Sequence, residues 1–251
     1  MLRIEGVTKV FTTSGRGVLA LDKVDLQLNK GSFTSVIGPS GCGKSTLLRI
    51  AGGLETSTGG SVALAEPAAI AFVFQDHGLF PWLTALDNVA FGLKMAGVSK
   101  SERYQRSREW LGRVGLADFE SAFPDSLSGG MRQRLSLARA FVVEPEILLM
   151  DEPMGALDEQ TRLLVQEDLM RLWEETRKTV LLVTHSIDEA ILLGDRIVVM
   201  SRRPGKIKKD LQVELDRPRS LHTMTAPRFA SLKDEIIETL HDEVSASMEL
   251  R

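Results

Sequence analysis

The sequence predicts an α/β protein whose parallel sheet is interrupted by a block of helices. Two nearly all-apolar runs, EILLMDE (146–152) and TVLLVTH (179–185), are separated by a long helical pattern. Strands of that composition are typical of parallel sheets that are covered on both faces. A third apolar run, FTSVIG (33–38), leads through a glycine-rich loop into another helical pattern. Strands that alternate with helices in this way define the fold class.

The first part of the chain reads mainly as strands. Residues 1–30 alternate apolar and polar positions, which predicts two or three strands with a turn at TTSGRG (12–17). The run at 33–38 is the next strand, and LLRIAGG (47–53) follows the glycine-rich loop as a helix. SVALAEPAAIAFVFQ (61–75) supplies two more strands.

From Thr84 to Phe141 the apolar period changes to that of a helix. TALDNVAFGLKMAG (84–97) opens with a threonine cap and ends at Gly97, and two more helices follow at 101–115 and 128–141. This block interrupts the α/β core.

The C-terminal part returns to strands before a final helix. EQTRLLVQEDLMRLWEE (159–175) is a long helical pattern between two apolar strands. Residues 197–215 predict a hairpin around Pro204-Gly205. Residues 225–250 predict a helix whose apolar stripe contains Phe229, Leu232, Ile236, Leu240 and Val244.

The composition is that of an ordinary globular protein. The 251 residues are 43% hydrophobic and 26% charged, with a formal net charge of −3. Nucleic-acid-binding proteins usually carry a marked basic excess, so this balance argues against that class. The one cysteine, Cys42, excludes an internal disulfide and indicates a reducing compartment. We expect neither a signal peptide nor a membrane-spanning segment, so work at a membrane requires a partner.

GPSGCGKST (38–46) lies between a predicted strand and a predicted helix and fits the phosphate-loop pattern. Glycines let the backbone wrap a phosphate with its N–H groups pointing inward. The ammonium of Lys44 then reaches the outer phosphates, and the hydroxyl of Ser45 binds Mg²⁺. The alternative is a chance glycine-rich turn. Cys42 inside the loop is interpreted as a small residue, not as a redox group.

Four polar side chains end or directly follow predicted strands. Asp151 ends an apolar strand, where its carboxylate can hold the Mg²⁺ shell. Glu152 is not needed to hold the metal, so we expect its carboxylate to accept a proton from the attacking water. The alternative is that Glu152 only caps the next element. His185 and Gln75 close two further strands, and ligands gather at the carboxyl ends of parallel strands. A lone histidine such as His185 is otherwise usually structural.

LSGGMRQRL (127–135) is a second helix start that is suited to an anion. A serine and two glycines precede an arginine-rich amphipathic run, so backbone N–H groups and the helix dipole face outward. This helix start has no lysine of the kind that Lys44 supplies to the first.

Together the motifs resemble the ATP-binding-cassette (ABC) ATPase family, from Ile4 to about Ser201, with LSGGMRQR as the most specific part. The resemblance implies a RecA-like P-loop NTPase core with an N-terminal antiparallel β subdomain and an α-helical subdomain inserted at about 77–143. The ABC ATPase domain is then residues 1–201, and residues 202–251 form a hairpin and helical extension.

The resemblance also implies cofactors and residue roles. ATP and Mg²⁺ are the cofactors; Ser45, Gln75 and Asp151 hold the metal. Glu152 is the general base, His185 contacts the γ-phosphate, and Gln75 reports to a transmembrane partner. The residues implied to contact the nucleotide are Phe11, Gly38, Pro39, Ser40, Gly41, Cys42, Gly43, Lys44, Ser45, Thr46, Ser128, Gly129, Gly130 and Asp158.

Two of these roles come with further expectations. Phe11 stacks on adenine, unless it is a core residue near the end of its strand. Asp158, in GALD, belongs to the loop between subunits. In this family the second anion-binding helix start closes over the ATP of another subunit. The resemblance thus implies a head-to-tail homodimer with nucleotides at the interface, in which one lysine per chain is enough.

The phrases FVFQDHGLFPWLTALDNVAFGL (72–93) and MSRRPGKI (200–207) resemble the nitrate, sulfonate and taurine importer subgroup. This implies uptake of a small anionic solute through a separate permease, with a solute-binding protein as an indirect partner, at the cytoplasmic face of the cell membrane. The stretch from Leu79 to Trp82 is either a groove for the permease or ordinary core. Met154, where the subgroup often has an aromatic residue, and a short segment between 60 and 72 depart from the pattern.

Several alternatives stay open. The first alternative is an importer ATPase for another solute. The second is a soluble ABC ATPase that is not tied to transport, and the third is a cassette that binds ATP without hydrolysing it. Soluble ABC ATPases need a long coiled coil or two cassettes, and Glu152 and His185 argue against the third alternative. A basic cluster on the hairpin is either a solvated edge that discourages strand pairing or a surface for anionic lipid: Arg202, Arg203, Lys206, Lys208 and Lys209.

Overall fold

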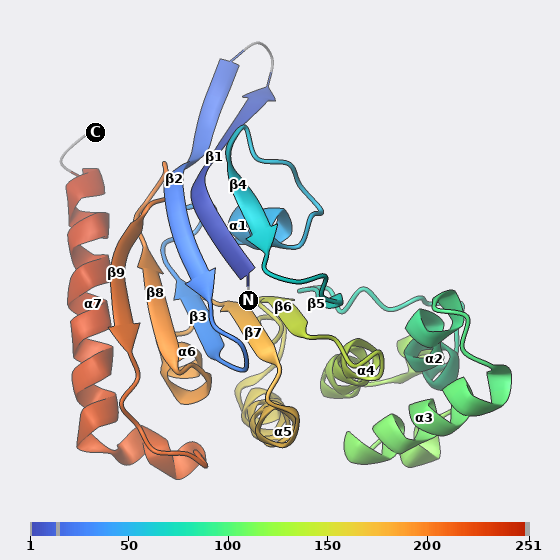
Figure 1. Ribbon diagram of the computed structural model, residues 1–251. Helices are drawn as coiled ribbons and strands as arrows, with labels where there is room; N and C mark the ends of the chain where they lie inside the picture. Colours follow the sequence, from blue (N-terminus) through green and yellow to red (C-terminus); the bar gives the residue numbers. More distant parts are fainter. Residues whose placement is uncertain (1, 14–15, 249–251) are drawn as a thin grey trace. The chain divides into compact units, whose positions relative to one another are not determined.

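In a computed structural model, which describes residues 2–13 and 16–248, the chain forms two compact units (Figure 1). The first unit comprises Met1–Ala68 and Arg177–Arg251, and the second comprises Ala69–Thr176. Both units combine strands with helices, and the predicted α/β class is confirmed.

The first unit contains an antiparallel sheet of the order β2-β1-β4, built from β1 (Leu2–Thr13), β2 (Arg16–Leu28) and β4 (Gly59–Leu64). Leu2 pairs with Leu28 on one side and with Leu64 on the other. Burial alternates along the start of β1, where apolar side chains are covered and the intervening polar ones are exposed. The predicted N-terminal strands are therefore confirmed; residues 14 and 15 of the predicted turn lie outside the described residues.

The same unit contains parallel strands in the order β7-β3-β8, followed by the antiparallel β9. Every residue of β3 and β7 is buried, as their mostly apolar patterns predicted. β8 and β9 form the predicted hairpin. Because β3 and β8 are parallel neighbours, the phosphate loop after β3 and the turn after β8 lie at the same end of the sheet. The bounds are β3 (Phe33–Ile37), β7 (Thr179–Val183), β8 (Arg196–Met200) and β9 (Ile207–Gln212).

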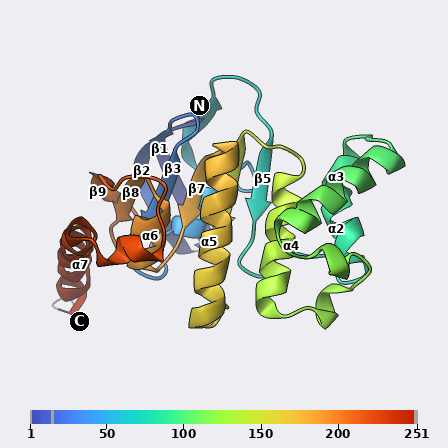
Figure 2. The ribbon, with the colours of Figure 1, turned by 90° about the horizontal axis from the view of Figure 1, so that it is seen from below.

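The helices of the first unit are α1 (Lys44–Ala51), α6 (Ile187–Leu193) and α7 (Pro227–Met248), with a 3₁₀ turn at Leu221–Thr225. The predicted apolar stripe of α7 is buried at Phe229, Leu232 and Ile236, whereas the side chain of Val244 lies outside the described ones. Helix α7 runs alongside β9, to which Lys209 and Glu235 join it (Figures 1 and 2).

Helix α6 was not predicted from the sequence. Its start carries a local signal nevertheless, because the Ser186 hydroxyl accepts a hydrogen bond from the Glu189 N–H. Beyond its C-terminal end, the buried guanidinium of Arg219 ties the following chain to it through backbone carbonyls. The acceptors are those of Ile191, Leu192, Gly194, Val213 and Leu215.

The second unit pairs two parallel strands, β5 (Ile70–Val73) and β6 (Ile147–Asp151), and adds four α-helices. Helices α2, α3 and α4 pack together (Figure 2), with the Trp110 and Phe141 rings stacked at a centroid distance of 5.4 Å. The helices are α2 (Ala85–Met95), α3 (Lys100–Arg113), α4 (Gly129–Phe141) and α5 (Glu159–Thr176), with 3₁₀ turns at Ala117–Phe119 and Pro124–Ser126.

The predicted cap at Thr84 is confirmed, since its hydroxyl accepts from the Asp87 N–H at 3.2 Å. Among the helices of residues 2–13 and 16–248, none is long and apolar enough to cross a membrane.

Candidate nucleotide-binding site

The glycine-rich loop joins the buried strand β3 to α1, as predicted. Gly43 is the residue before the helix and has a φ of 106°, a conformation that side chains rarely adopt. A Cβ at Gly43 would also lie 2.7 Å from Leu21 Cδ2 and 3.0 Å from the Ala20 carbonyl oxygen. Strand β2 therefore packs so closely against the loop that only glycine fits there.

Lys44 opens α1 and is nearly buried, with 6% of its surface exposed. Its Nζ donates to the carbonyl oxygens of Gly38 at 2.9 Å and Pro39 at 3.2 Å. The ammonium thus lies over the loop, and Ser45 and Thr46 follow it in the first helical turn. Free N–H groups at a helix N-terminus together with a cation form an anion-binding arrangement.

Cys42 is fully buried inside the loop. Burial raises the pKa of its thiol, so the reactive thiolate is disfavoured. This environment agrees with the interpretation of Cys42 as a small structural residue of the loop.

His185 lies at the same edge of the sheet as the phosphate loop. Val36 pairs with Val183, so β3 and β7 end side by side, and the Thr184 N–H donates to the Val36 carbonyl at 3.1 Å. The Thr184 hydroxyl accepts from the Ser186 N–H and bonds the Glu189 carboxylate. These bonds hold the backbone on either side of His185, whose side chain is exposed.

Phe11 is 37% exposed on β1, so its interpretation as a core residue is wrong. The ammonium of Lys9 lies 4.8 Å from its ring centroid and also bonds Glu55 at 2.7 Å and the Thr56 carbonyl at 2.7 Å. The hydrogen bond from Lys9 lowers the pKa of the Glu55 carboxyl. Lys9 pairs with Leu21, the β2 residue that packs against Gly43, so Phe11 is on the strand beside the one that packs against the phosphate loop.

The second unit places Gln75, Asp151 and Glu152 at one edge. Val73 of β5 pairs with Met150 of β6, so Gln75 and Glu152 follow their strands at equal distances from this pair. Asp151 is buried, whereas Glu152 is half-buried and has a φ of 44°. A left-handed backbone at a non-glycine residue costs about 1–3 kcal/mol and clusters at functional sites.

The second predicted anion-binding helix start is also formed. Ser128 is the N-cap of α4, and its hydroxyl accepts from the Met131 N–H at 3.2 Å. A Cβ at Gly130 would lie 2.4 Å from Thr161 Cγ2. The turn therefore packs against the first turn of α5, a contact that brings Thr161, which sequence reasoning missed, into this part of the site.

Asp158 is hydrogen-bonded to Thr161, the residue that faces Gly130 in the second unit. Its Oδ1 accepts from the Thr161 N–H at 3.0 Å. Hydrogen bonds from the Thr161 side chain and backbone lower the pKa of this carboxyl. The predicted inter-subunit loop and the Ser128 turn are thus neighbours, linked by Thr161.

A partly buried polar cluster connects the segment after Gln75 to α4. His77 Nδ1 lies 2.7 Å from Gln133 Oε1, and the Arg139 guanidinium donates to the carbonyls of His77 at 2.9 Å and Gly78 at 2.6 Å. Sequence reasoning missed this cluster. The only local signal was the richness of α4 in polar residues on a helix that is otherwise apolar.

Beyond this cluster the loop 80–84 presents Trp82, which is 70% exposed. Asn88 is fully buried beneath the loop; it accepts from the Phe80 N–H at 2.9 Å and donates to the carbonyls of Phe80, Leu83 and Thr84. Trp82 is therefore an exposed side chain on a firmly held loop, and its interpretation as core is wrong.

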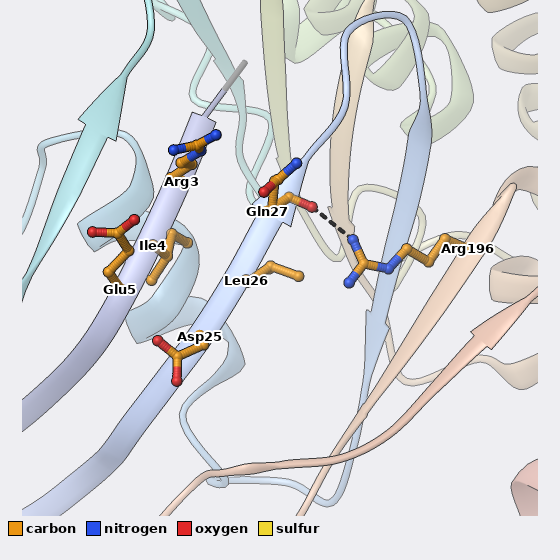
Figure 3. A pocket seen from close by; sticks show the side chains of 7 residues that line it. All are labelled: Arg3, Ile4, Glu5, Asp25, Leu26, Gln27 and Arg196. Atoms are coloured by element: carbon orange, nitrogen blue, oxygen red, sulfur yellow. Dashed lines mark hydrogen bonds between the residues drawn. The ribbon is translucent and has the colours of Figure 1, made fainter.

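A separate surface pocket lies along β1 and β2 (Figure 3). Arg196 at its edge donates to the Gln27 carbonyl at 2.6 Å, and its hydrogen bonds with Asp210 raise the pKa of its guanidinium. Arg196 pairs with Thr34 near the amino end of β3, whereas the phosphate loop follows the carboxyl end. Because ligands gather at carboxyl ends, we do not assign this pocket to the nucleotide.

The predicted Mg²⁺ donors are a hydroxyl, an amide and a carboxylate oxygen, from Ser45, Gln75 and Asp151. Among the described residues, no group of three or more His, Cys, Asp or Glu side chains gathers as a metal site. Hard oxygen donors that are few in number suit Mg²⁺, which is usually completed by substrate phosphates and water. The residues therefore fit Mg²⁺ bound together with a nucleotide.

Comparison with known proteins identifies the family. Residues 21–155, more than half of the chain, match the family described as ABC transporter. The chain belongs to this family. Two solved structures of a dimeric bacterial ABC transporter cassette, one of them in a post-hydrolysis state with ADP and Pi, align with TM-scores of 0.77. They are 36% and 35% identical in sequence, and each alignment covers 86% of this chain and 100% of the cassette.

Several ABC proteins resemble this chain along most of its length. An uncharacterized ABC transporter ATP-binding protein of Methanocaldococcus jannaschii is 45% identical, covering 98% of this chain and 94% of the relative. A taurine import ATP-binding protein of Rhizobium johnstonii is 45% identical, with coverages of 96% and 97%. An aliphatic sulfonates import ATP-binding protein of Bacillus cereus is 43% identical, with coverages of 94% and 94%. The predicted ABC fold and ATPase class are confirmed.

Proposed function

We propose that this ABC ATPase powers an importer of small organic anions of the sulfonate and taurine class. The support for the substrate class is the similarity to the sulfonate and taurine import proteins along nearly the whole chain. The observation that carries the catalytic part is the left-handed backbone of Glu152, directly after the buried Asp151 at the end of β6. Such strain persists only where the surrounding structure holds the backbone in place, and it clusters at active sites.

The phosphate loop binds ATP in this proposal. The N–H groups of the loop and of the first turn of α1 surround the outer phosphates, and the ammonium of Lys44 moves from the Gly38 and Pro39 carbonyls to them. The partly exposed ring of Phe11 stacks on the adenine base. Ser45, Gln75 and Asp151 hold Mg²⁺, which neutralises phosphate charge when it is bound.

Glu152 accepts the proton of the attacking water, and His185 contacts the γ-phosphate. Asp151 is the buried carboxylate and belongs to the metal, whereas Glu152 is half-buried and therefore accessible to water. The two adjacent carboxylates thus have different environments that suit different tasks.

The Ser128 turn closes over the nucleotide of a second copy of the chain. It exposes a capped helix start that has no lysine of the kind that Lys44 supplies, and the guanidinium of Arg132 there donates to the Leu127 carbonyl. The dimeric cassettes of similar structure support this arrangement. The homodimer then has nucleotides at its interface, with Asp158 in the loop between subunits.

Loop 80–84 docks the transmembrane permease in this proposal, because Trp82 is exposed while Asn88 fixes the loop beneath it. The chain then works at the cytoplasmic face of the membrane, held there by the permease, and a solute-binding protein supplies the solute.

The test is uptake of radiolabelled taurine or an alkanesulfonate by cells that express the chain with its permease and binding protein. Matched cells carry Lys44→Ala. We expect uptake in the cells that carry the unaltered chain and no uptake in the cells that carry Lys44→Ala. Active ATPase without uptake of either solute contradicts the substrate class, whereas absence of ATP hydrolysis by the purified protein contradicts the catalytic assignment.

A further inference from the structure

The turn between β8 and β9, residues 201–206, packs directly against the phosphate loop. The Gly205 N–H donates to the Ala20 carbonyl at 2.8 Å, and the Gly205 carbonyl accepts from the Asp22 N–H at 3.0 Å. A Cβ at Gly205 would lie 2.1 Å from the Cys42 carbonyl oxygen. The 201–206 turn is therefore fixed to β2 and touches the loop through its backbone.

Arg203 extends from this turn to the loop itself. Its Nε and Nη2 both donate to the Gly41 carbonyl oxygen, at 3.3 Å and 3.2 Å. Gly41 has a φ of 74°, so the arginine binds the loop at a point of unusual backbone conformation. Hydrogen bonds from a charged donor are stronger than neutral ones, so the guanidinium of Arg203 can stabilise the Gly41 carbonyl even at the surface.

The peptide that Arg203 holds is part of a chain of hydrogen bonds that leads to Lys44. In a planar trans peptide the C=O and N–H point in opposite directions. While the Gly41 carbonyl accepts from Arg203, the N–H of Cys42 donates to the Pro39 carbonyl at 3.3 Å. The same Pro39 carbonyl accepts from Lys44 Nζ at 3.2 Å. Arg203 therefore orients the peptide that closes the loop and positions an acceptor of Lys44.

The basic cluster of the hairpin is thus more than a solvated edge, one of the two interpretations that the sequence left open. Lys206 pairs with Asp22 at 2.8 Å, and Lys209 pairs with Glu235 at 2.9 Å. These two lysines attach the hairpin to neighbouring elements, and Arg203 differs from them because its partner is the phosphate loop.

We propose that Arg203 is a positioning residue for nucleotide binding, which holds the Gly41–Cys42 peptide so that the loop and Lys44 are ready for phosphate. This rests on the proposed role of the phosphate loop. Loss of Arg203 loosens the loop and weakens binding of nucleotide, while the fold is retained because the backbone bonds of Gly205 remain.

The test compares Arg203→Met with Lys206→Met, which removes the same charge from the same turn but leaves Arg203 in place. Titration calorimetry with MgADP measures affinity, and urea unfolding measures stability. We expect Arg203→Met to raise the Kd for MgADP about 5- to 10-fold, Arg203→Lys to recover part of the loss, and Lys206→Met to stay within about twofold of the unaltered protein. The urea midpoint of Arg203→Met should stay unchanged.

A second readout is local. Hydrogen exchange of a peptide covering residues 38–43 should be faster in Arg203→Met and unchanged in Lys206→Met. Equal loss of affinity in both variants would overturn the proposal in favour of a general charge effect. Unaltered affinity in Arg203→Met also overturns it, provided that Lys44→Ala binds MgADP poorly. If Lys44→Ala binds normally, the assignment of the phosphate loop fails first, and the role of Arg203 fails with it.

Discussion

The phosphate loop of the first unit and the Ser128 turn of the second are both glycine-rich helix starts, but they need glycine for different physical reasons. In the phosphate loop, Gly41 and Gly43 have positive φ, and the loop is enclosed by β2 and the 201–206 turn. Gly130 is not among the positive-φ glycines; its hydrogen faces the methyl group of Thr161. One motif needs glycine for its backbone conformation, and the other needs it for close packing.

The two helix starts also differ in charge. Lys44 is nearly buried over its own loop, whereas the Ser128 turn carries a neutral hydroxyl cap. A helix start without a lysine over it holds an anion more weakly by itself, so it suits a nucleotide that is already held by another loop. The difference favours a shared site in which each chain contributes one helix start of each kind.

The largest expected effect concerns Glu152, which neither helix start can replace because both are suited to binding phosphate and neither offers a carboxylate that accepts a proton. Glu152→Gln should lower ATP turnover by at least about 10²-fold and leave nucleotide binding intact. Steady-state ATPase assays and nucleotide titration measure this. Glu159→Gln on the exposed start of α5 is the matched control and should hydrolyse ATP normally. Near-normal turnover of Glu152→Gln would remove the general base from the proposal.

The next effect separates the two helix starts. Ser128→Asp keeps an N-cap residue but adds a carboxylate where the phosphate of a second chain should approach. Turnover should fall about 10²-fold, while affinity for MgADP stays within about twofold. Ser128→Thr, which keeps the cap without the charge, is the control. Lys44→Ala should instead lose both turnover and affinity, and a parallel loss of ADP affinity in Ser128→Asp would contradict the division of roles.

Mixed dimers sharpen this comparison. One chain carries Lys44→Ala, the other carries Ser128→Asp, and Glu152→Gln in both prevents hydrolysis. A shared site leaves one composite site whole, so labelled ATP should be trapped in the mixed dimer and in neither homodimer. Mixed dimers that form but trap no ATP count against the shared site.

A smaller effect tests why Gly130 is a glycine. Gly130→Ala places a methyl group against Thr161 Cγ2, at 2.4 Å in the unrelaxed structure, and should cost about 1–3 kcal/mol in urea unfolding. Thr161→Ser removes that methyl group and should restore most of the loss in the double variant. Gly43→Ala should show no comparable rescue by a change at Leu21, because its φ of 106° remains unfavourable. If the losses of unfolding free energy from Gly130→Ala and Thr161→Ser simply add in the double variant, the contact with Thr161 does not explain why residue 130 is a glycine.

The smallest expected effect is on stability at loop 80–84. Trp82→Ala should change the free energy of unfolding by no more than about 0.5 kcal/mol, since the side chain is exposed. Trp110→Ala, in the core of the same unit, should cost about 3–5 kcal/mol and serves as the control. With the permease present, Trp82→Ala should reduce transport while the ATPase of the isolated protein is retained. A strongly lowered melting temperature for Trp82→Ala would instead make it a packing residue.

Local patterns were sufficient for most elements of the fold. The alternation in β1, the mostly apolar runs of β3, β6 and β7, and the Thr84 and Ser128 caps depend on neighbours only a few residues away, and the structure confirms them. Helix α6 was missed although its Ser186 cap is equally local. Its seven residues are too few to establish an amphipathic period, and five of them, both polar and apolar, are buried.

By itself the sequence determined the α/β class, the ABC family and the chemical types of the site residues, because those depend on residue identity and short spacing. The tertiary structure alone decided that Trp82 and Phe11 are exposed, that Thr161 faces Gly130 and that Arg203 holds Gly41. The last contact joins residues 162 positions apart in the chain. A local sequence pattern cannot predict the contact between Arg203 and Gly41. The contact arises only when β8 folds beside β3 and brings the 201–206 turn to the phosphate loop.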